Sequence, residues 1–262
     1  MNTYKEKLAE EYKKIFEKDR NKPDWAVKKK SGVGNVHPAI PFVGESYEKT
    51  RLLLYASAEN MTKYEKEEEW YADDNDAMYR RYSLGNEYFP SLYMKPVTDG
   101  PLLVVAAYIL KKLNIDFNYS CPYEFIKNIA IDNFGKFSRK TTPQDRVNKD
   151  YAGNERMLNA SYEYIKRDLE ILEPKIIILP KTIFNHENVK SLLPNNCKIF
   201  PIYQINARNI NLRISKQYEK KNRNEIPEIF LNWQKNLKNG ISKKTNDNFD
   251  SVYTYLDKLL CC

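Results

Sequence analysis

A helix followed directly by an apolar strand constrains the fold of this chain more than any other feature. Residues 154–172 carry apolar side chains at alternating spacings of four and three, the period of a helix with one buried face. After Pro174, the sequence of 175–179 is Lys-Ile-Ile-Ile-Leu. Such an apolar run is typical of a strand that is covered on both faces, as in the centre of a parallel sheet. The apolar helix positions are Leu158, Tyr162, Ile165, Leu169 and Leu172.

The same alternation of helix and strand repeats along the chain. Three further apolar runs, at 40–43, 125–131 and 198–203, predict strands. Strands that alternate with helices favour a parallel sheet. We therefore expect an α/β fold, a three-layer sandwich with a central four-stranded parallel sheet flanked by helices.

Helical patterns fill the segments between these strands and both ends of the chain. The sequence predicts a single domain over 1–262, because no linker or repeat divides it. The expected helices lie at 2–19, 47–60, 101–113 and 182–193, a C-terminal helical extension lies at 224–262, and 133–149 is expected to be a polar loop.

The charge balance is basic, with 43 Lys and Arg residues against 35 Asp and Glu residues and a formal net charge of +8. This excess favours a polyanionic partner such as DNA. Two histidines and four cysteines without a Cys-x-x-Cys pair argue against a zinc site or an iron–sulfur cluster, so we expect no metal and no cofactor.

The distribution of apolar residues argues against a membrane protein. The charged N-terminus lacks the apolar core of a signal peptide. The most apolar stretch, 102–110, is too short to span a bilayer. We therefore expect a cytoplasmic monomer without membrane contact.

Polar segments follow each of the expected strands. Ligands of parallel α/β sheets bind at the carboxyl ends of the strands, so side chains that matter for function should gather there. The four segments are Gly44-Glu45-Ser46-Tyr47, Asp132-Asn133-Phe134-Gly135-Lys136, Pro180-Lys181-Thr182 and Gln204-Ile205-Asn206-Ala207-Arg208.

The order of these segments resembles that of the uracil-DNA glycosylase superfamily. Val43-Gly44-Glu45-Ser46 is similar to the family's strand-end Gly followed by an acidic or amide residue, and Asn133-Phe134-Gly135-Lys136-Phe137 is similar to its Asn-x-x-Lys-Cys motif. Residues 168–179 look like the helix and strand before its final motif. Gln204 or Asn206 falls where the family has the His of His-Pro-Ser. The resemblance implies a DNA glycosylase.

The chemistry of base removal gives these residues separate roles. Glu45 could stabilise the cationic sugar and position a water, or it could be an ordinary first-turn carboxylate with Ser46 as the N-cap. Asn133 offers a donor and an acceptor to a base edge, or it turns the chain after a strand. Gln204 and Asn206 could hold the departing base, or they cap a loop. The base pocket is expected to include Gly44, Ser46 and Tyr47.

Basic and hydroxyl side chains near two of these segments suit contacts with DNA phosphates, although a solvated loop is the ordinary alternative. They are Lys136, Ser138, Arg139, Lys140, Arg208 and Arg213.

These observations favour a monofunctional DNA glycosylase that flips a base and hydrolyses its N-glycosidic bond. Because the final motif differs from that of the family, we expect a damaged or modified base, and a phage-type modified cytosine would imply antiviral defence. Two alternatives remain open: a catalytically silent DNA-binding module on the same fold, and an α/β enzyme that acts on a small nucleoside or nucleotide.

Overall fold

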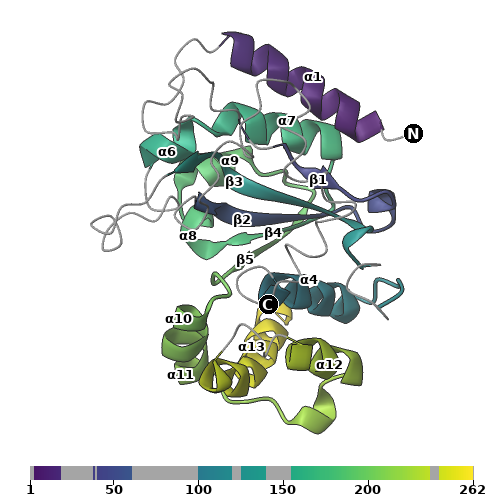
Figure 1. The fold of residues 1–262 in the computed structure, drawn as a ribbon, viewed down its shortest axis with the longest axis vertical. Coiled ribbons are helices and arrows are strands. Elements are labelled where there is room, and N and C mark those ends of the chain that lie inside the picture. The colour runs from purple at the N-terminus through teal and green to yellow at the C-terminus, as the bar shows by residue number, and fades with distance from the viewer. Residues whose placement is uncertain are drawn as a thin grey trace. The chain divides into compact units, whose positions relative to one another are not determined.

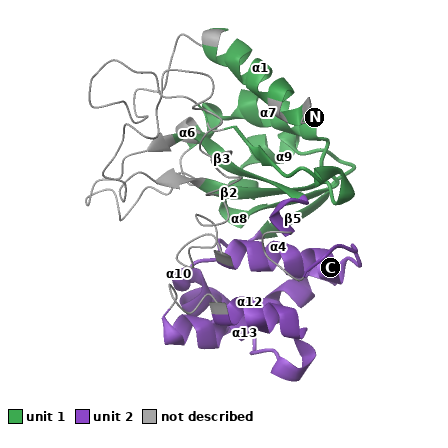
Figure 2. Ribbon diagram, turned by 45° about the vertical axis from the view of Figure 1, so that its right-hand side comes forward, with its two compact units in different colours: residues 1–85, 129–201 green, residues 86–128, 202–262 purple. Residues whose placement is uncertain are grey.

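The computed structural model places most of the chain into two units, which we describe separately (Figure 2). Unit 1 comprises 1–85 and 129–201, and unit 2 comprises 86–128 and 202–262. The expectation of a single domain over 1–262 stays a prediction. The structure describes residues 3–18, 38, 40–60, 100–119, 125–139, 155–236 and 242–261.

Unit 1 is built on a five-stranded sheet in the order β1-β3-β2-β4-β5 (Figure 1). β2 runs parallel to both of its neighbours, with Leu52 opposite Ile129 of β3 and Ile176 of β4. β1 pairs with β3 in the antiparallel direction. The strands are β1 Phe42–Val43, β2 Leu52–Asn60, β3 Ile129–Arg139, β4 Ile176–Pro180 and β5 Lys198–Ile202.

The α/β class is therefore confirmed, whereas the prediction of four strands, all parallel, is wrong. The sheet has a fifth strand because residues 47–60 are not the expected helix. A short 3₁₀ helix spans Tyr47–Lys49, and β2 follows it. Leu52, Leu53 and Leu54 are all fully buried, since β2 lies between two strands and is covered on both faces. An apolar run of this length shows no period that separates a strand from a buried helix.

Helices α1 (Thr3–Lys18) and α7 (Tyr162–Leu172) lie side by side in unit 1 (Figure 1). They bury their apolar faces in one core together with Leu53 of β2, Phe134 of β3 and Ile177 of β4. The expected helix 2–19 is thus present. This core stabilises the position of α1 because Leu8 and Tyr12 are fully buried in it.

The expected helix at 154–172 is interrupted. Helix α6 spans Glu155–Asn159, and α7 begins at Tyr162. Between them, the Ser161 hydroxyl oxygen accepts a hydrogen bond of 2.9 Å from the backbone amide of Lys136. The helix expected at 182–193 is likewise divided, into α8 (Lys181–Phe184) and α9 (Glu187–Leu192).

Unit 2 is helical and has its own aromatic core. Phe230 lies within ring-contact distance of Tyr108, Tyr119 and Trp233. α4 matches the helix expected at 101–113, and α12 and α13 form the expected C-terminal helical extension. The elements are α4 Gly100–Lys112, α10 Ala207–Asn209, a π-helix Ile210–Ile214, α11 Ser215–Gln217, a 3₁₀ helix Arg223–Glu225, α12 Glu228–Asn236 and α13 Lys243–Leu260. None of the helices in the described ranges is long and apolar enough to cross a membrane.

Candidate functional site

The structure places Glu45 away from the carboxyl ends of the parallel strands. Because β1 is antiparallel to β3, the end of β1 lies beside the beginning of β3, where the Gly44 amide donates a 3.0 Å hydrogen bond to the Ile129 carbonyl. Glu45 follows in an exposed turn. The expectation that the Gly-Glu-Ser-Tyr segment follows a parallel strand is therefore wrong.

The rest of that turn has mainly a packing role. Tyr47 is buried, and its ring makes an edge-to-face contact with Tyr4 of α1. Ser46 stands at the N-cap position of the 3₁₀ helix, but its side chain makes no capping hydrogen bond. Gly44 is buried beside β3. Whether these residues bind a base stays a prediction.

The segment expected as a loop after a strand is instead the middle of β3. Asn133 lies opposite Ala56 of β2, is only 9% exposed, and donates its backbone amide to Asp132 Oδ1 at 2.7 Å. β3 continues to Arg139, so Ser138 and Arg139 are at the carboxyl end of the strand, with Asn60 opposite Arg139. Lys140 lies outside the described residues.

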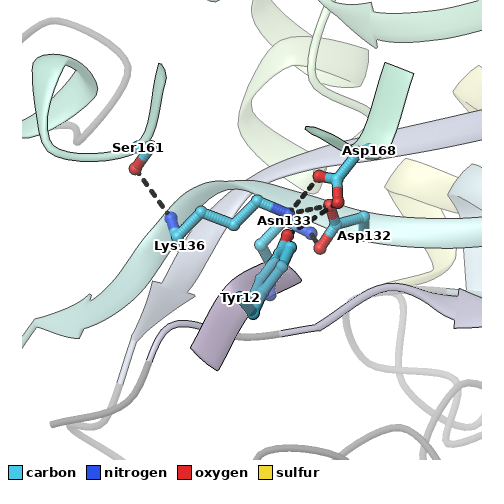
Figure 3. A network of polar contacts seen from close by, with 6 residues as sticks. All are labelled: Tyr12, Asp132, Asn133, Lys136, Ser161 and Asp168. Atoms are coloured by element: carbon cyan, nitrogen blue, oxygen red, sulfur yellow. Dashed lines mark hydrogen bonds and ion pairs between the residues drawn. The ribbon is translucent and has the colours of Figure 1, made fainter. Parts of the chain in front are cut away.

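Lys136 belongs to the interior of unit 1 rather than to a phosphate-binding loop. Its ammonium group pairs with Asp132 and, at 2.6 Å, with Asp168 Oδ2 of α7 (Figure 3). All three side chains are 0% exposed. The prediction that Lys136 contacts DNA phosphates is wrong for this structure, because alternation along β3 turns its side chain to the face that α1 and α7 cover.

Tyr12 completes this buried cluster from α1. Its hydroxyl donates a 2.7 Å hydrogen bond to Asp168 Oδ1, and the Lys136 ammonium lies 5.3 Å from the centre of its ring (Figure 3). Burial raises the pKa of Asp132 well above its usual range, although the Lys136 ammonium opposes the rise. Burial also raises the pKa of Asp168, against the effect of Lys136 and of the Tyr12 hydrogen bond. We call Tyr12, Asp132, Lys136 and Asp168 the buried charge cluster.

The final group of predicted residues lies in unit 2. Asn206 caps α10, since its Oδ1 accepts a 2.9 Å hydrogen bond from the amide of Asn209. The Asn209 side chain in turn donates to the Gln204 carbonyl at 2.9 Å. The capping role of Asn206 is thus observed. Contact of Gln204 or Asn206 with a base stays a prediction, as does their convergence with Glu45 and Asn133, which belong to unit 1.

The helical segment after this cap, 207–217, carries an exposed apolar side chain among cations. Leu212 is 53% exposed, and Arg208, Arg213 and Lys216 are exposed in the same segment. The Arg213 guanidinium lies 5.9 Å from the centre of the Tyr203 ring. The sequence does not indicate that Leu212 is exposed, because a single leucine between Asn and Arg can be buried or exposed. We call 207–217 the basic segment.

The strand order also contains a reversal of winding that the sequence did not indicate. From β2 the chain goes first to β3 on one side and then to β4 on the other, so the direction of winding reverses between β2 and β4. Ligands of open α/β sheets bind beside the carboxyl ends of the strands at such a reversal. In this chain β2 ends with Glu59 and Asn60, and β4 ends with Pro180, which Lys181 of α8 follows. We call this position the switch point.

Neither the metal-binding side chains of the described residues nor comparisons with known proteins indicate a further site. Within the described ranges, no group of three or more His, Cys, Asp or Glu side chains is close enough to hold a metal ion. Comparisons with protein-family models, with characterised proteins and with solved structures found no match to this chain.

Proposed function

We propose that this chain is a monofunctional DNA glycosylase, which flips a damaged or modified base out of DNA and hydrolyses its N-glycosidic bond. The observation that carries the proposal is the switch point, where the winding of the parallel sheet reverses between β2 and β4. Base removal develops positive charge on the sugar and needs a carboxylate that stabilises this charge and positions the attacking water. We assign this role to Glu59 from its place in the chain alone, as the acidic residue next to the end of β2.

The charge of the chain supports DNA as the substrate. The sequence has a formal net charge of +8, which suits a polyanionic substrate better than a free nucleoside. Two residues proposed for phosphate contact, Ser138 and Arg139, are the last of β3, and the backbone of Arg139 lies opposite Asn60 of β2.

The basic segment in unit 2 supports DNA binding independently. An exposed leucine surrounded by cations has the chemistry of a side chain that inserts between base pairs while its neighbours bind phosphates. The proposal includes action as a cytoplasmic monomer, either in repair or in defence against DNA with modified bases. It requires no metal and no cofactor.

The decisive experiment is a screen of the purified chain on DNA duplexes and single strands carrying different modified bases, followed by alkali cleavage at abasic sites. Once a substrate is found, Glu59→Gln should slow base release by about 100-fold or more in single-turnover reactions, because it keeps the shape but removes the charge. Glu45→Gln is the matched variant at the other end of the sheet, and we expect its release rate to be close to that of the wild type. A slow Glu45→Gln with a normal Glu59→Gln would return the catalytic role to Glu45.

DNA binding is tested separately by its salt dependence. The triple change Arg208→Ala, Arg213→Ala, Lys216→Ala should lower the slope of log K against log salt by about one for each phosphate that these side chains neutralise in the wild type. The control triple Lys14→Ala, Lys166→Ala, Lys190→Ala removes the same charge from exposed positions of unit 1, and its slope should match that of the wild type. Equal slopes for the two triples would exclude the basic segment from the interface.

A catalytically silent DNA-binding module is the second candidate, and one observation favours it. The Asn-x-x-Lys residues Asn133 and Lys136 are buried within β3, so the part of the chain most similar to a glycosylase motif has a structural role. Salt-dependent DNA binding without base release from any substrate would support this candidate and reject the enzyme.

A further inference from the structure

The buried charge cluster holds more acidic groups than basic ones. Asp132 and Asp168 supply two carboxyl groups, whereas Lys136 supplies one ammonium. All three are inaccessible to solvent. With both carboxyls ionised, the interior of unit 1 would contain an uncompensated negative charge, which burial strongly disfavours.

A proton removes this imbalance, and the geometry contains a place for it. The carboxyl groups of Asp132 and Asp168 both pair with the ammonium of Lys136, so they lie close together. Two ionised carboxylates are both acceptors, so a hydrogen bond between them requires a hydrogen on one of the two. Asp168 accepts from Tyr12 and Lys136, and Asp132 accepts from the Asn133 amide and Lys136. Burial raises the pKa of Asp132 further than that of Asp168, so we assign the proton to Asp132.

The described elements around the two carboxyls contribute titratable side chains to their surroundings. These are Tyr12 from α1, Tyr55 from β2, Lys136 from β3 and, beside Tyr12, Tyr164 from α7. Tyr55 stands opposite Asp132 in the sheet. Its hydroxyl is buried and makes no hydrogen bond to any of the described residues. The lysine is thus the cation that these neighbours provide.

We propose that the buried charge cluster binds one proton at neutral pH, held between Asp132 and Asp168, and that loss of this proton loosens α1. Deprotonation passes the proton to solvent and leaves one net negative charge under α1. The cluster is joined to α1 by the hydrogen bond from Tyr12 to Asp168. Opening of α1 lets water reach the carboxylates, so the opened state gains stability relative to the closed state as the pH rises. This inference is independent of the proposed function.

The sign of the effect follows from linkage. Burial raises the pKa of Asp132, so the folded state holds a proton that the unfolded or opened state releases. The stabilisation from this group is complete below the ordinary aspartate pKa, and it is lost as the pH rises through the raised pKa of the folded state.

Hydrogen exchange of the full chain tests the proposal. Amide protection of α1, corrected for the intrinsic exchange rate, should fall as the pH is raised from about 6 to about 9 in the wild type. In Asp132→Asn, where an amide replaces the protonated acid, α1 protection should not change with pH. An equal fall in both proteins, or no fall in the wild type, would overturn the link between the proton and α1.

Infrared spectroscopy tests the proton itself without requiring any variant to fold. The wild type at neutral pH should show the carbonyl stretching band of a protonated, buried carboxyl, and Asp132→Asn should lack this band. Absence of the band from the wild type would overturn the proposal.

Denaturation adds a third measurement. Asp132→Asn should keep the wild-type midpoint of unfolding. The double variant Asp132→Asn, Asp168→Asn, which leaves the ammonium unpaired, should lower this midpoint. An equal loss in the single and double variants would also overturn the proposal, because replacing a protonated Asp132 with a neutral amide removes no charge.

Discussion

Arg51 and Glu173 both have left-handed backbone conformations, with φ of 48° and 43°, and their side chains form an ion pair of 3.1 Å between Nη2 and Oε2. Arg51 immediately precedes β2, and its carbonyl accepts hydrogen bonds from the amides of Lys175 and Ile176 at the beginning of β4. Glu173 is the C-cap of α7. The pair therefore fixes the beginnings of the two central strands that flank the switch point.

The backbone of Glu173 gives the first prediction. A left-handed conformation suits glycine and opposes β-branched residues, so Glu173→Gly should be at least as stable as the wild type, and Glu173→Val should lose about 1–2 kcal/mol. Urea denaturation measures both. Glu170, exposed within α7, is the matched position: there glycine should be the worse substitution, by about 0.5 kcal/mol relative to valine. The same order at both positions would contradict the backbone argument.

Lys136 gives the second prediction. Lys136→Met keeps much of the side-chain volume but leaves two buried carboxyls without a cation, and we expect a loss of about 3–5 kcal/mol in the free energy of unfolding. Lys166→Met changes an exposed lysine of α7 in the same way, and it should stay within about 0.5 kcal/mol of the wild type. Similar stability of the two variants would mean that Lys136 is not needed to balance the cluster.

The third prediction compares two buried tyrosine hydroxyls of unit 1. Tyr12→Phe removes a hydrogen bond to the ionised carboxylate of Asp168 and should cost about 1.5–3 kcal/mol. Tyr55→Phe removes a buried hydroxyl that bonds to no described residue, so it should be neutral or stabilising. Thermal and urea denaturation of the two variants give the comparison. A larger loss from Tyr55→Phe would place a hydrogen-bond partner, such as a buried water, beside that hydroxyl.

The fourth prediction concerns thiol reactivity. Burial raises the pKa of Cys197 to about 12, from an ordinary value of 9.0. At pH near 8 its thiolate fraction should be about 1,000-fold below that of an ordinary cysteine, and alkylation should be correspondingly slow. Peptide mass spectrometry after iodoacetamide treatment should find the peptide with the exposed Cys261 modified well before the one with Cys197. Unfolding in urea should remove the difference, and equal rates in the native protein would contradict the burial argument.

The sequence predicted those parts of the fold in which one local signal dominates. The helical period and the following apolar run located β4 and the end of α7 to within about a residue, although α7 begins at Tyr162 rather than at 154. β2 was mistaken for a helix because Leu52–Leu54 owes its strand conformation to β3 and β4, which are distant in the sequence.

The buried charge cluster was missed for a related reason. A lysine in a polar, glycine-containing segment is typical of a surface loop. Its partner Asp168 is 32 residues further along the chain, so no local pattern connects the two. One signal was present: in a strand, Asp132 and Lys136 must share a face with Ala130 and Phe134. Opposite charges on an otherwise apolar face indicate a buried pair, provided that the strand is recognised first.

The strand order has a consequence for the rate of folding. β2 is the first long strand in the chain, yet both of its neighbours come later, and the chain forms α4 of unit 2 before it returns to unit 1 as β3. The centre of the sheet therefore closes only through contacts between distant residues, and such topologies fold more slowly than those built from local contacts. Until then β2 is an apolar strand with two unpaired edges, which is the form most open to aggregation. Refolding yield should accordingly fall as the protein concentration rises. Replacing Leu53 with a charged residue should slow aggregation during refolding, but it should also lower the stability of the native core.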